Sequence, residues 1–258
     1  MTQTIEVNKI YNEDCLEGMK RIHDGSVDCI ICDLPYGTTK NPWDSVISLD
    51  ALWMEYKRII KPSGAIVLFA QTPFDKVLGA SNIEMLKYEW IWEKDSGTGH
   101  LNSKFAPMKK HENILVFSKK AACFVKNIDD AMTYYPQMES GKPYTQKSGR
   151  PSLNYDAANC HQVITENKGE RYPTSVLKFN RDKSKIHPTQ KPVDLIAYLI
   201  RTYTNEGELV LDNCMGSGTT AIACIKERRH FIGFELNKEY YEKSLKRIEN
   251  EKSQLKLF

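Results

Sequence analysis

Residues 208–235 read ELVLDNCMGSGTTAIACIKERRHFIGFE and decide the fold class. An apolar strand is predicted at 208–212, where it ends on an aspartate, and a helix begins after the glycine-rich turn that follows. A second apolar strand is predicted at 230–235 and ends on a glutamate. Two strands separated by a helical pattern form a βαβ unit, so this stretch predicts a parallel sheet in an α/β fold.

The same alternation of strands and helices extends toward both ends of the chain. Further strands are predicted at 26–33, 65–70, 88–92 and 113–118, and helices at 14–22, 49–60, 74–86, 193–203, 219–227 and 238–252. The run SVDCIICD at 26–33 is nearly all apolar, as expected of a parallel strand buried on both faces. Residues 88–92 and 113–118 are expected to form a hairpin with a long loop. The pattern as a whole predicts a Rossmann-like, mostly parallel sheet with helices on both faces.

The composition of the 258 residues fits a globular protein of a reducing compartment. Hydrophobic residues make up 41% and charged residues 27%, which allows a sizeable core and excludes wholesale disorder. The uncharged run at 62–74 is too short and too interrupted to cross a bilayer, and the first residues contain no secretory signal pattern. The seven cysteines are scattered and odd in number, which is atypical of a disulfide framework. We therefore expect a cytoplasmic protein without a membrane segment.

Basic residues are concentrated in the middle of the chain. Residues 101–191 contain 16 Lys and Arg against 8 Asp and Glu, whereas the rest of the chain contains 20 against 25. Within this region, 119–186 is rich in Lys, Tyr, Asn, Pro and Gly and lacks regular periodicity. A contact surface for a polyanion and a solvated basic face both explain the charge. We expect an insert at 119–186 that separates two halves of one domain at 1–118 and 187–258.

The glycine-rich turn predicts a site for a nucleoside-containing cofactor. Residues 216–221 match G-x-G-x-x-A, in which glycines let the backbone turn sharply and approach a ligand closely. Glu235 ends the next strand, where a carboxylate can accept both hydroxyl groups of a ribose. A tight turn with a surface glutamate is the alternative. The Asp212 carboxylate would repel a pyrophosphate and attract an ammonium group, which favours S-adenosylmethionine over a dinucleotide.

The tetrapeptide Asp33-Leu34-Pro35-Tyr36 ends the strand at 26–33. Leu34 precedes a proline and is biased to extended backbone, which leaves its carbonyl free to point away from the sheet. The Asp33 carboxylate and this carbonyl could accept both hydrogens of an exocyclic amino group, while Tyr36 could stack on a flat base. An ordinary turn after a buried strand explains the same residues without a ligand.

These motifs resemble the beta class of DNA amino-methyltransferases. That family has a D-P-P-Y tetrapeptide, a target-recognition region, an H-P-T-Q-K-P stretch and a D-P-F-x-G-S-G-T-T cofactor loop, in this order. The chain has DLPY at 33–36, the basic insert, HPTQKP at 187–192 and DNCMGSGTT at 212–220. Asp14-Cys15 before a short helix also matches. The resemblance covers nearly the whole chain outside 119–186, and it implies a seven-stranded methyltransferase sheet and S-adenosylmethionine as the cofactor.

The resemblance also implies the residues of both ligand sites. Asp33, Leu34, Pro35 and Tyr36 would bind the target base. The cofactor would be bound by Asp14, Cys15, Asp33, Thr189, Lys191, Asp212, Asn213, Gly216, Ser217, Gly218, Thr219 and Glu235. In this assignment Asp14 accepts from the adenine amino group of the cofactor, and Thr189 and Lys191 face its methionine carboxylate. Leu34 and the pair Asn213-Cys214 depart from the family pattern, in which these positions are Pro and Pro-Phe.

Double-stranded DNA is the expected macromolecular partner. The insert interleaves tyrosines with Lys142, Lys147 and Arg150, a mixture that suits phosphate and base contacts, although an aromatic core with solvated lysines is the alternative. Lys40 and Trp43 belong to a segment after the tetrapeptide that we expect to cover the extruded base. A partner restriction endonuclease and a homodimer are further expectations from the family. We expect no metal, because Cys29 and Cys32 lie inside a buried strand, and Cys123, Cys160 and His161 lack paired spacing.

Several functions compete at this stage, and a site-specific adenine-N6 DNA methyltransferase is the leading hypothesis. N4-cytosine methylation is the nearest rival, although aspartate at the first tetrapeptide position goes mostly with adenine in the family. RNA and protein amino-methyltransferases usually carry asparagine there and have the glycine loop before the tetrapeptide. A nicotinamide-dependent oxidoreductase leaves the tetrapeptide and the basic insert unexplained. A binding protein that has lost catalysis would account for Leu34 and Asn213-Cys214.

Overall fold

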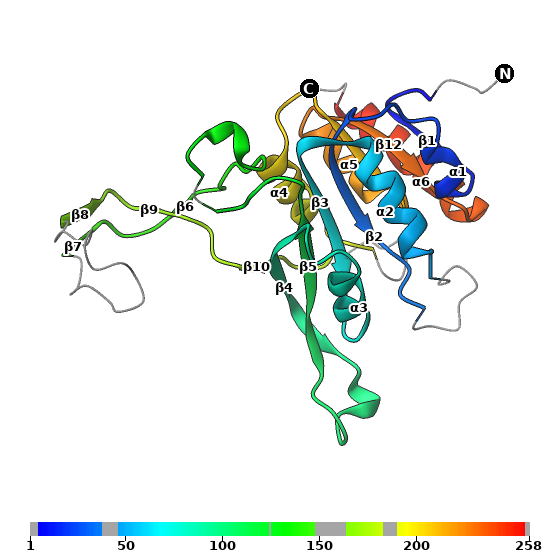
Figure 1. Cartoon of the computed structure of the whole chain (residues 1–258). Coiled ribbons are helices and arrows are strands. Elements are labelled where there is room, and N and C mark those ends of the chain that lie inside the picture. Colours follow the sequence, from blue (N-terminus) through cyan, green and yellow to red (C-terminus); the bar gives the residue numbers. More distant parts are fainter. Residues whose placement is uncertain (1–4, 38–45, 124, 148–163, 183–189, 256–258) are drawn as a thin grey trace. The chain divides into compact units, whose positions relative to one another are not determined.

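The computed structural model describes residues 5–37, 46–123, 125–147, 164–182 and 190–255. The chain divides into two compact units, of which the first comprises Met1–Tyr135 with Ser175–Phe258 and the second Pro136–Thr174. Figure 1 shows the α/β body of the first unit, which contains both termini. None of the helices in the described ranges combines the length and the apolar character that a membrane span requires.

An eight-stranded sheet forms the centre of the first unit, in the order β1-β12-β11-β2-β3-β5-β4-β10. Its strands are β1 (Lys9–Tyr11), β2 (Val27–Asp33), β3 (Ile60–Ala70), β4 (Leu86–Thr98), β5 (Lys109–Phe117), β10 (Val176–Lys178), β11 (Leu209–Asp212) and β12 (His230–Phe234). All neighbouring pairs are parallel except those of β5, which is antiparallel to β3 and β4. The mostly parallel α/β sheet is confirmed, but it has eight strands rather than seven. The two strands that the pattern did not predict, β1 and β10, are three residues long.

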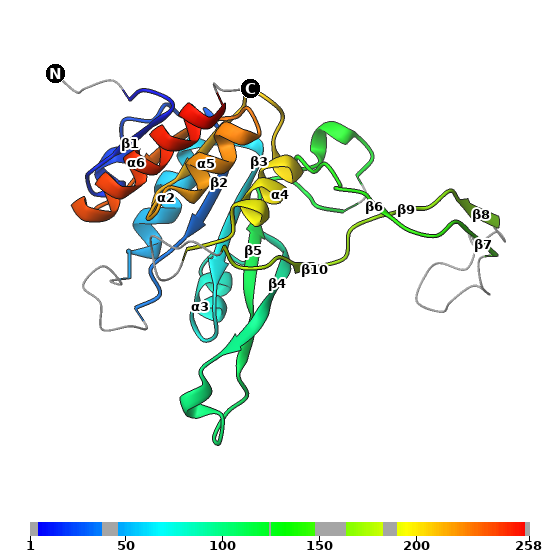
Figure 2. The same cartoon turned by 180° about the vertical axis from the view of Figure 1, so that it is seen from behind.

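Helices cover both faces of the sheet, as predicted. They are α1 (Cys15–Met19), α2 (Leu49–Ile59), α3 (Phe74–Ser81), α4 (Val193–Tyr203), α5 (Thr219–Lys226) and α6 (Lys238–Leu255). Two apolar clusters separate the faces: one contains buried residues of α1, α2 and α3, and the other those of α4, α5 and α6. Figure 2 shows the second face, with α4, α5 and α6 in front of the strands. Cys29 belongs to one cluster and Cys32 to the other, so the assignment of both thiols to the core is confirmed.

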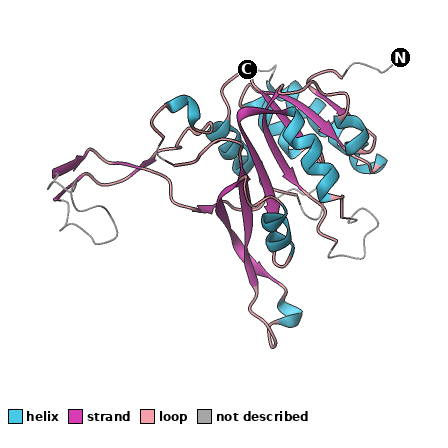
Figure 3. Cartoon of the chain, in the orientation of Figure 1, coloured by secondary structure: helices cyan, strands magenta, loops and turns pink. Residues whose placement is uncertain are grey.

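The hairpin of β4 and β5 is longer than predicted. Figure 3 shows its two magenta strands extending well beyond the rest of the sheet. The predicted strands at 88–92 and 113–118 cover its inner part, where Trp92 pairs with Glu112, and the outermost pair is Thr98 with Lys109. The helix predicted at 74–86 ends at Ser81, because Asn82 leaves the helical conformation with φ −152° and ψ 58°.

The described residues of the second unit, 136–147 and 164–174, form two small antiparallel ribbons. β6 (Glu139–Ser140) pairs with β9 (Glu170–Arg171), and β7 (Tyr144–Lys147) pairs with β8 (Ile164–Asn167). No described residue of this unit is buried. The second unit is shorter than the insert predicted at 119–186. Both ends of that predicted segment belong to the first unit, where Met132 and Leu177 are buried in the core.

Candidate active site

A cavity of about 520 Å³ opens at the carboxyl edge of the parallel strands. Its lining contains most residues predicted for the two ligand sites, namely Asp14, Cys15, Asp33, Leu34, Pro35, Tyr36, Lys191, Asp212, Asn213, Gly216, Ser217, Thr219 and Glu235. These residues come together because β2 lies beside β11 in parallel register, with Ile30 opposite Leu211. Asp33 and Asp212 therefore end neighbouring strands at one edge, where ligands of open α/β sheets bind.

One predicted cofactor residue does not line the cavity. Gly218 has φ +79°, and a Cβ atom built there would lie 3.1 Å from the Cβ atom of Ser244 on α6. Its side-chain direction thus faces the helix behind the turn, and the glycine serves the conformation of the turn. Gly216 and Ser217 on the same turn do line the cavity, and a contact of Gly218 with the cofactor stays a prediction.

Two carboxylates that line the cavity accept hydrogen bonds from the glycine-rich turn after β11. Asp212 is 5% exposed, accepts the Cys214 N–H through Oδ1 at 3.0 Å and the Thr220 hydroxyl through Oδ2 at 2.6 Å. Burial raises its pKa to about 7. Glu235 accepts the Gly216 N–H through Oε2 at 2.7 Å and the Asn237 N–H through Oε1 at 2.8 Å. Because buried carboxylates without a cation are costly, a positively charged ligand group beside Asp212 would be favourable.

The opposite wall is formed by the start of α1. Asp14 caps this helix through Oδ1, which accepts the N–H groups of Leu16 at 2.9 Å and Glu17 at 3.2 Å. Within the described residues its Oδ2 has no hydrogen-bond partner, and the side chain lines the cavity. One carboxylate oxygen therefore remains for a ligand donor, such as the amino group that the resemblance assigned to it.

The Asn213 side chain explains one departure from the family pattern. It is 2% exposed, and its Oδ1 accepts a hydrogen bond from the hydroxyl of Tyr56 on α2. Its Nδ2 lies 3.6 Å from the sulfur atoms of Cys15 and Cys214. Asn213 thus ties the turn after β11 to α1 and α2, a polar link that the usual proline could not form.

The tetrapeptide after β2 is held by its own side chains. The Tyr36 hydroxyl donates to Asp33 Oδ1 at 2.6 Å, and its ring lies against that of Phe74 with 5.3 Å between centroids. Leu34 is buried, and Asp33 and Tyr36 line the cavity. Tyr36 therefore orients Asp33 in addition to offering an aromatic surface.

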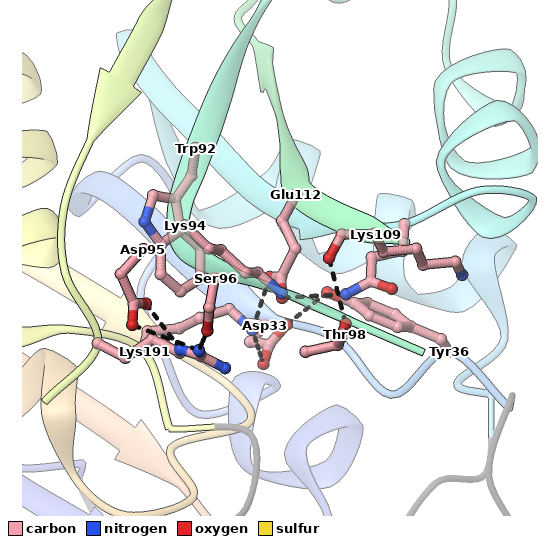
Figure 4. Close-up of polar contacts among 12 residues, drawn as sticks. Asp33, Tyr36, Trp92, Lys94, Asp95, Ser96, Thr98, Lys109, Glu112 and Lys191 are labelled. Atoms are coloured by element: carbon pink, nitrogen blue, oxygen red, sulfur yellow. Dashed lines mark hydrogen bonds and ion pairs between the residues drawn. The ribbon is translucent and has the colours of Figure 1, made fainter. Parts of the chain in front are cut away.

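Buried ions surround Asp33 in an arrangement that the sequence analysis did not predict (Figure 4). Lys191 Nζ lies 2.5 Å from Asp33 Oδ2 and 3.1 Å from Glu112 Oε2. Glu112 on β5 also binds Lys94 on β4, with 2.5 Å between Nζ and Oε1, and accepts the Gln71 amide at 3.0 Å. Lys191, expected at the methionine carboxylate, thus contacts the tetrapeptide carboxylate. A glutamate directly before the run NILVF at 113–117 of β5 was the available signal, but only the fold reveals its partners.

The charges of this cluster act on the pKa of Asp33 in opposite directions. Burial raises the pKa of Asp33, and the Lys191 ammonium group opposes this shift. Burial lowers the pKa of Lys191, but Asp33 and Glu112 outweigh it, so that pKa lies above its ordinary value. Burial also acts to raise the pKa of Glu112, which Lys191 and Lys94 bring down to about 2. Two lysines and two carboxylates therefore balance one another in the cavity wall.

The residues predicted to contact DNA divide into two groups. Lys142 and Lys147 are exposed in the second unit. Lys40, Trp43 and Arg150 lie outside the described residues, as do Thr189, Cys160 and His161. Within the described ranges, no cluster of His, Cys, Asp or Glu has the arrangement of a metal site.

Comparisons with known proteins identify the family of the chain. Residues 27–246 match the family model N6_N4_Mtase, described as DNA methylase. The chain is 32% identical to the type II methyltransferase M1.MboII of Moraxella bovis, over 92% of this chain and 94% of that protein. It is 29% identical to the DNA adenine methyltransferase YhdJ of Escherichia coli strain K12, over 95% and 83% of the two chains.

Solved structures show the same architecture. The M1.HpyAVI–SAM complex is 27% identical with a TM-score of 0.59, and the match covers 93% of this chain and 98% of that one. The cytosine-N4-specific PvuII DNA methyltransferase has a TM-score of 0.67 at 16% identity, over 94% and 86%, and shares the fold. With a family model that spans most of its length and a cavity lined by the family's motifs, the chain belongs to the N6_N4_Mtase family of DNA methylases.

Proposed function

We propose that this chain is a site-specific DNA methyltransferase that uses S-adenosylmethionine to methylate N6 of an adenine extruded from duplex DNA. The observation that carries the proposal is the single cavity onto which Asp33, Leu34 and Tyr36 open together with the turn after β11. Similar proteins support it, because YhdJ is described as a DNA adenine methyltransferase and M1.HpyAVI was solved with SAM. Aspartate as the first tetrapeptide residue favours adenine over cytosine.

The carboxylates of the cavity fit this cofactor better than a dinucleotide. Asp212 and Glu235 line the turn, and a pyrophosphate there would face two carboxylates. Asp212 would hold the ammonium group, Glu235 the ribose hydroxyls and Asp14 Oδ2 the adenine amino group. Gly216 and Ser217 would border the methionine part. When bound, S-adenosylmethionine supplies a methyl group activated by its sulfonium.

The tetrapeptide would prepare the amino group for attack. The lone pair of an adenine N6 is conjugated into the ring, so the nitrogen is a poor nucleophile. The Asp33 carboxylate and the Leu34 carbonyl would accept its two hydrogens, orient the lone pair toward the methyl group and stabilise the positive charge that develops. Positioning of this kind supplies up to roughly 7–11 kcal/mol. The Lys191 ammonium group would favour the ionised form of Asp33, in which both carboxylate oxygen atoms are acceptors and neither is a donor.

The partners and the setting complete the proposal. The second unit would recognise the target sequence through exposed residues such as Lys142 and Lys147. M1.MboII is a type II methyltransferase, and a restriction endonuclease with the same target would accompany this chain as well. The chain would act in the cytoplasm as a homodimer, which light scattering of the purified protein checks directly.

The test is single-molecule sequencing of DNA from cells that express the chain, with Asp33→Ala as the inactive control. We expect N6-methyladenine within one sequence context and none with the variant. N4-methylcytosine would establish the rival base, and unmodified DNA despite specific binding would establish a protein that has lost catalysis. Calorimetry with S-adenosylmethionine and NAD separates the cofactors, and tight NAD binding alone would refute the proposal.

A further inference from the structure

The connection between β4 and β5 displays large apolar side chains to solvent. We call residues 99–108 the hairpin tip. Phe105 is 88% exposed and Leu101 84% exposed, more than the other exposed hydrophobic residues of the described chain. Neither side chain contributes to the two apolar clusters of the fold. An apolar surface that folding does not need is typical of a contact site.

The hairpin tip holds these side chains in an ordered turn. Gly99 has φ +90°, a conformation that suits glycine, and it precedes the short helix η1 (His100–Asn102). The N–H groups of Phe105 and Ala106 donate to the Asn102 carbonyl at 2.9 and 3.0 Å. Backbone hydrogen bonds thus stabilise the turn, while the side chains of Leu101 and Phe105 remain exposed to solvent.

The hairpin starts at the catalytic cavity and extends away from it. β4 runs parallel to β2, so its end and Asp33 lie at the same edge of the sheet. At the cavity Trp92 pairs with Glu112, whose carboxylate contacts Lys191, and six residues farther along β4 Thr98 pairs with Lys109. On β5 this pair is three residues from Glu112, so at about 3.3 Å per residue it lies roughly 10 Å beyond Glu112, and the hairpin tip lies farther out. Figure 1 shows the hairpin of β4 and β5 extending beyond the other strands, and Figure 4 shows Glu112 of this hairpin close to Asp33 and Lys191.

The charge of the hairpin tip suits a polyanion. Residues 97–111 contain Lys104, Lys109 and Lys110 and no Asp or Glu. Lys110 pairs with Glu93 at 2.9 Å, whereas Lys104 and Lys109 are exposed and have no carboxylate partner among the described residues. Apolar tips flanked by lysines beside a base-binding cavity match the chemistry of a DNA duplex better than that of a protein surface.

We propose that the hairpin tip is a wedge that enters the DNA beside the target base. Phe105 and Leu101 would occupy the stack as the base leaves, and Lys104 and Lys109 would contact the flanking phosphates. Extruding a base breaks stacking and pairing, and apolar side chains inserted between base steps replace part of what is lost. A projection of more than about 10 Å is sufficient, because the major groove is about 8.5 Å deep. The inference rests on the proposed function.

The test compares methylation of two duplexes that carry the target sequence found by DNA sequencing. One is intact, and the other has an abasic site opposite the target adenine, which removes much of the work of extrusion. Phe105→Ala should lower kcat/KM about tenfold on the intact duplex and less than threefold on the abasic one. Phe105→Trp should retain activity on both, and 2-aminopurine at the target should lose its fluorescence rise with Phe105→Ala.

The matched control is Ile83→Ala, which removes a side chain 65% exposed in the turn before β4, far from the hairpin tip along the strand. It should leave both duplexes unaffected, and both variants should bind S-adenosylmethionine as the unchanged chain does. Equal losses on the two duplexes, or no loss on the intact one, would overturn the wedge, as would a dimer that dissociates with Phe105→Ala. If the unchanged chain methylates neither duplex, the proposed function fails and the wedge fails with it.

Discussion

The cavity and the second unit differ in how their polar residues are held. In the cavity, Asp212, Asn213 and Lys191 are buried, and each has defined partners within the chain. In the second unit, no described residue is buried, and Lys142 and Lys147 face solvent. The first region is organised by its own hydrogen bonds and ions, whereas the described part of the second unit contains two short ribbons.

This contrast predicts how each region responds to substitution. A change in the cavity alters a network whose members depend on one another, so its effect should be large and confined to chemistry or cofactor binding. A change on the exposed ribbons removes one contact at a time and should act additively on DNA binding. The experiments below test this separation, beginning with the largest expected effect.

Asp33→Ala should cause the largest loss. It removes an acceptor of the amino group and leaves the buried Lys191 ammonium with one carboxylate fewer. Methyl transfer should fall at least about a hundredfold, as when a preorganised polar group is removed from an active site. A tritiated-methyl assay on duplex DNA measures this, and DNA affinity should change much less. Near-normal turnover would refute the role of Asp33. It would also contradict the expectation that substitutions in the cavity have larger effects than those in the second unit.

Gly218→Val should abolish most cofactor binding through the backbone of the turn. Its φ of +79° is unfavourable for a side chain, and the added Cβ atom meets Ser244. We expect S-adenosylmethionine affinity to fall at least about tenfold by calorimetry. Gly207→Val is the matched control, since Gly207 has the same φ of +79° with no atom within 4 Å of the added Cβ. A similar loss with both variants would assign the effect to global stability.

Much of the buried framework could be predicted, because its residues form long apolar runs. α4 spans the predicted 193–203, and β2 and β11 begin within one residue of the predicted positions. The outer halves of β4 and β5 were missed, since charged residues at 93–95 and 109–112 do not read as strand. Long antiparallel pairing overrides that local pattern.

Residues of the candidate site that belong to a sequence motif could be predicted. Residues whose role depends on contacts with distant parts of the chain could not. Asp33, Tyr36 and Asp212 could be predicted because they lie at, or just after, the ends of apolar strands. Glu112 and Lys94 look like surface charges along the sequence, and their burial depends on Lys191, 79 residues beyond Glu112. The role of Gly218 likewise depends on Ser244 of a helix that follows later in the chain.

Reversing Lys142 and Lys147 to glutamate should weaken DNA binding mainly through salt-dependent contacts. If both lysines contact phosphates, the slope of log K against log salt should become shallower by about 2. Titrations at several salt concentrations measure this, and cofactor affinity should stay unchanged. Lys57→Glu with Lys246→Glu changes the charge equally at two exposed positions of the first unit and should leave the slope nearly intact. An unaltered slope for the ribbon variant would place the DNA elsewhere.

Glu112→Gln should shift the pH dependence of kcat without abolishing activity. The Glu112 charge raises the pKa of Asp33, so its removal lowers that pKa. Because the proposed mechanism requires ionised Asp33, the acidic limb of the profile should move to lower pH. Tyr36, Lys191 and Asp212 also act on Asp33 and remain in place. Lys94→Met removes a positive charge from the same cluster and should move the acidic limb to higher pH. Shifts of both variants in the same direction would contradict the proposed charge network.

The smallest effect concerns one proton on Asp212. Burial raises its pKa to about 7, so the free chain holds this proton at pH 6 and loses it by pH 8.5. The corresponding stabilisation of the folded chain is present at low pH and is lost as the pH rises toward 7, because the folded state binds the proton more tightly. An ammonium group beside Asp212 favours the carboxylate, so cofactor binding should release close to one proton at pH 6 and almost none at pH 8.5. Calorimetry in two buffers of different ionisation enthalpy counts these protons, and Asp212→Asn should remove the difference. Binding without proton release at pH 6 would mean that the ammonium group lies elsewhere in the cavity.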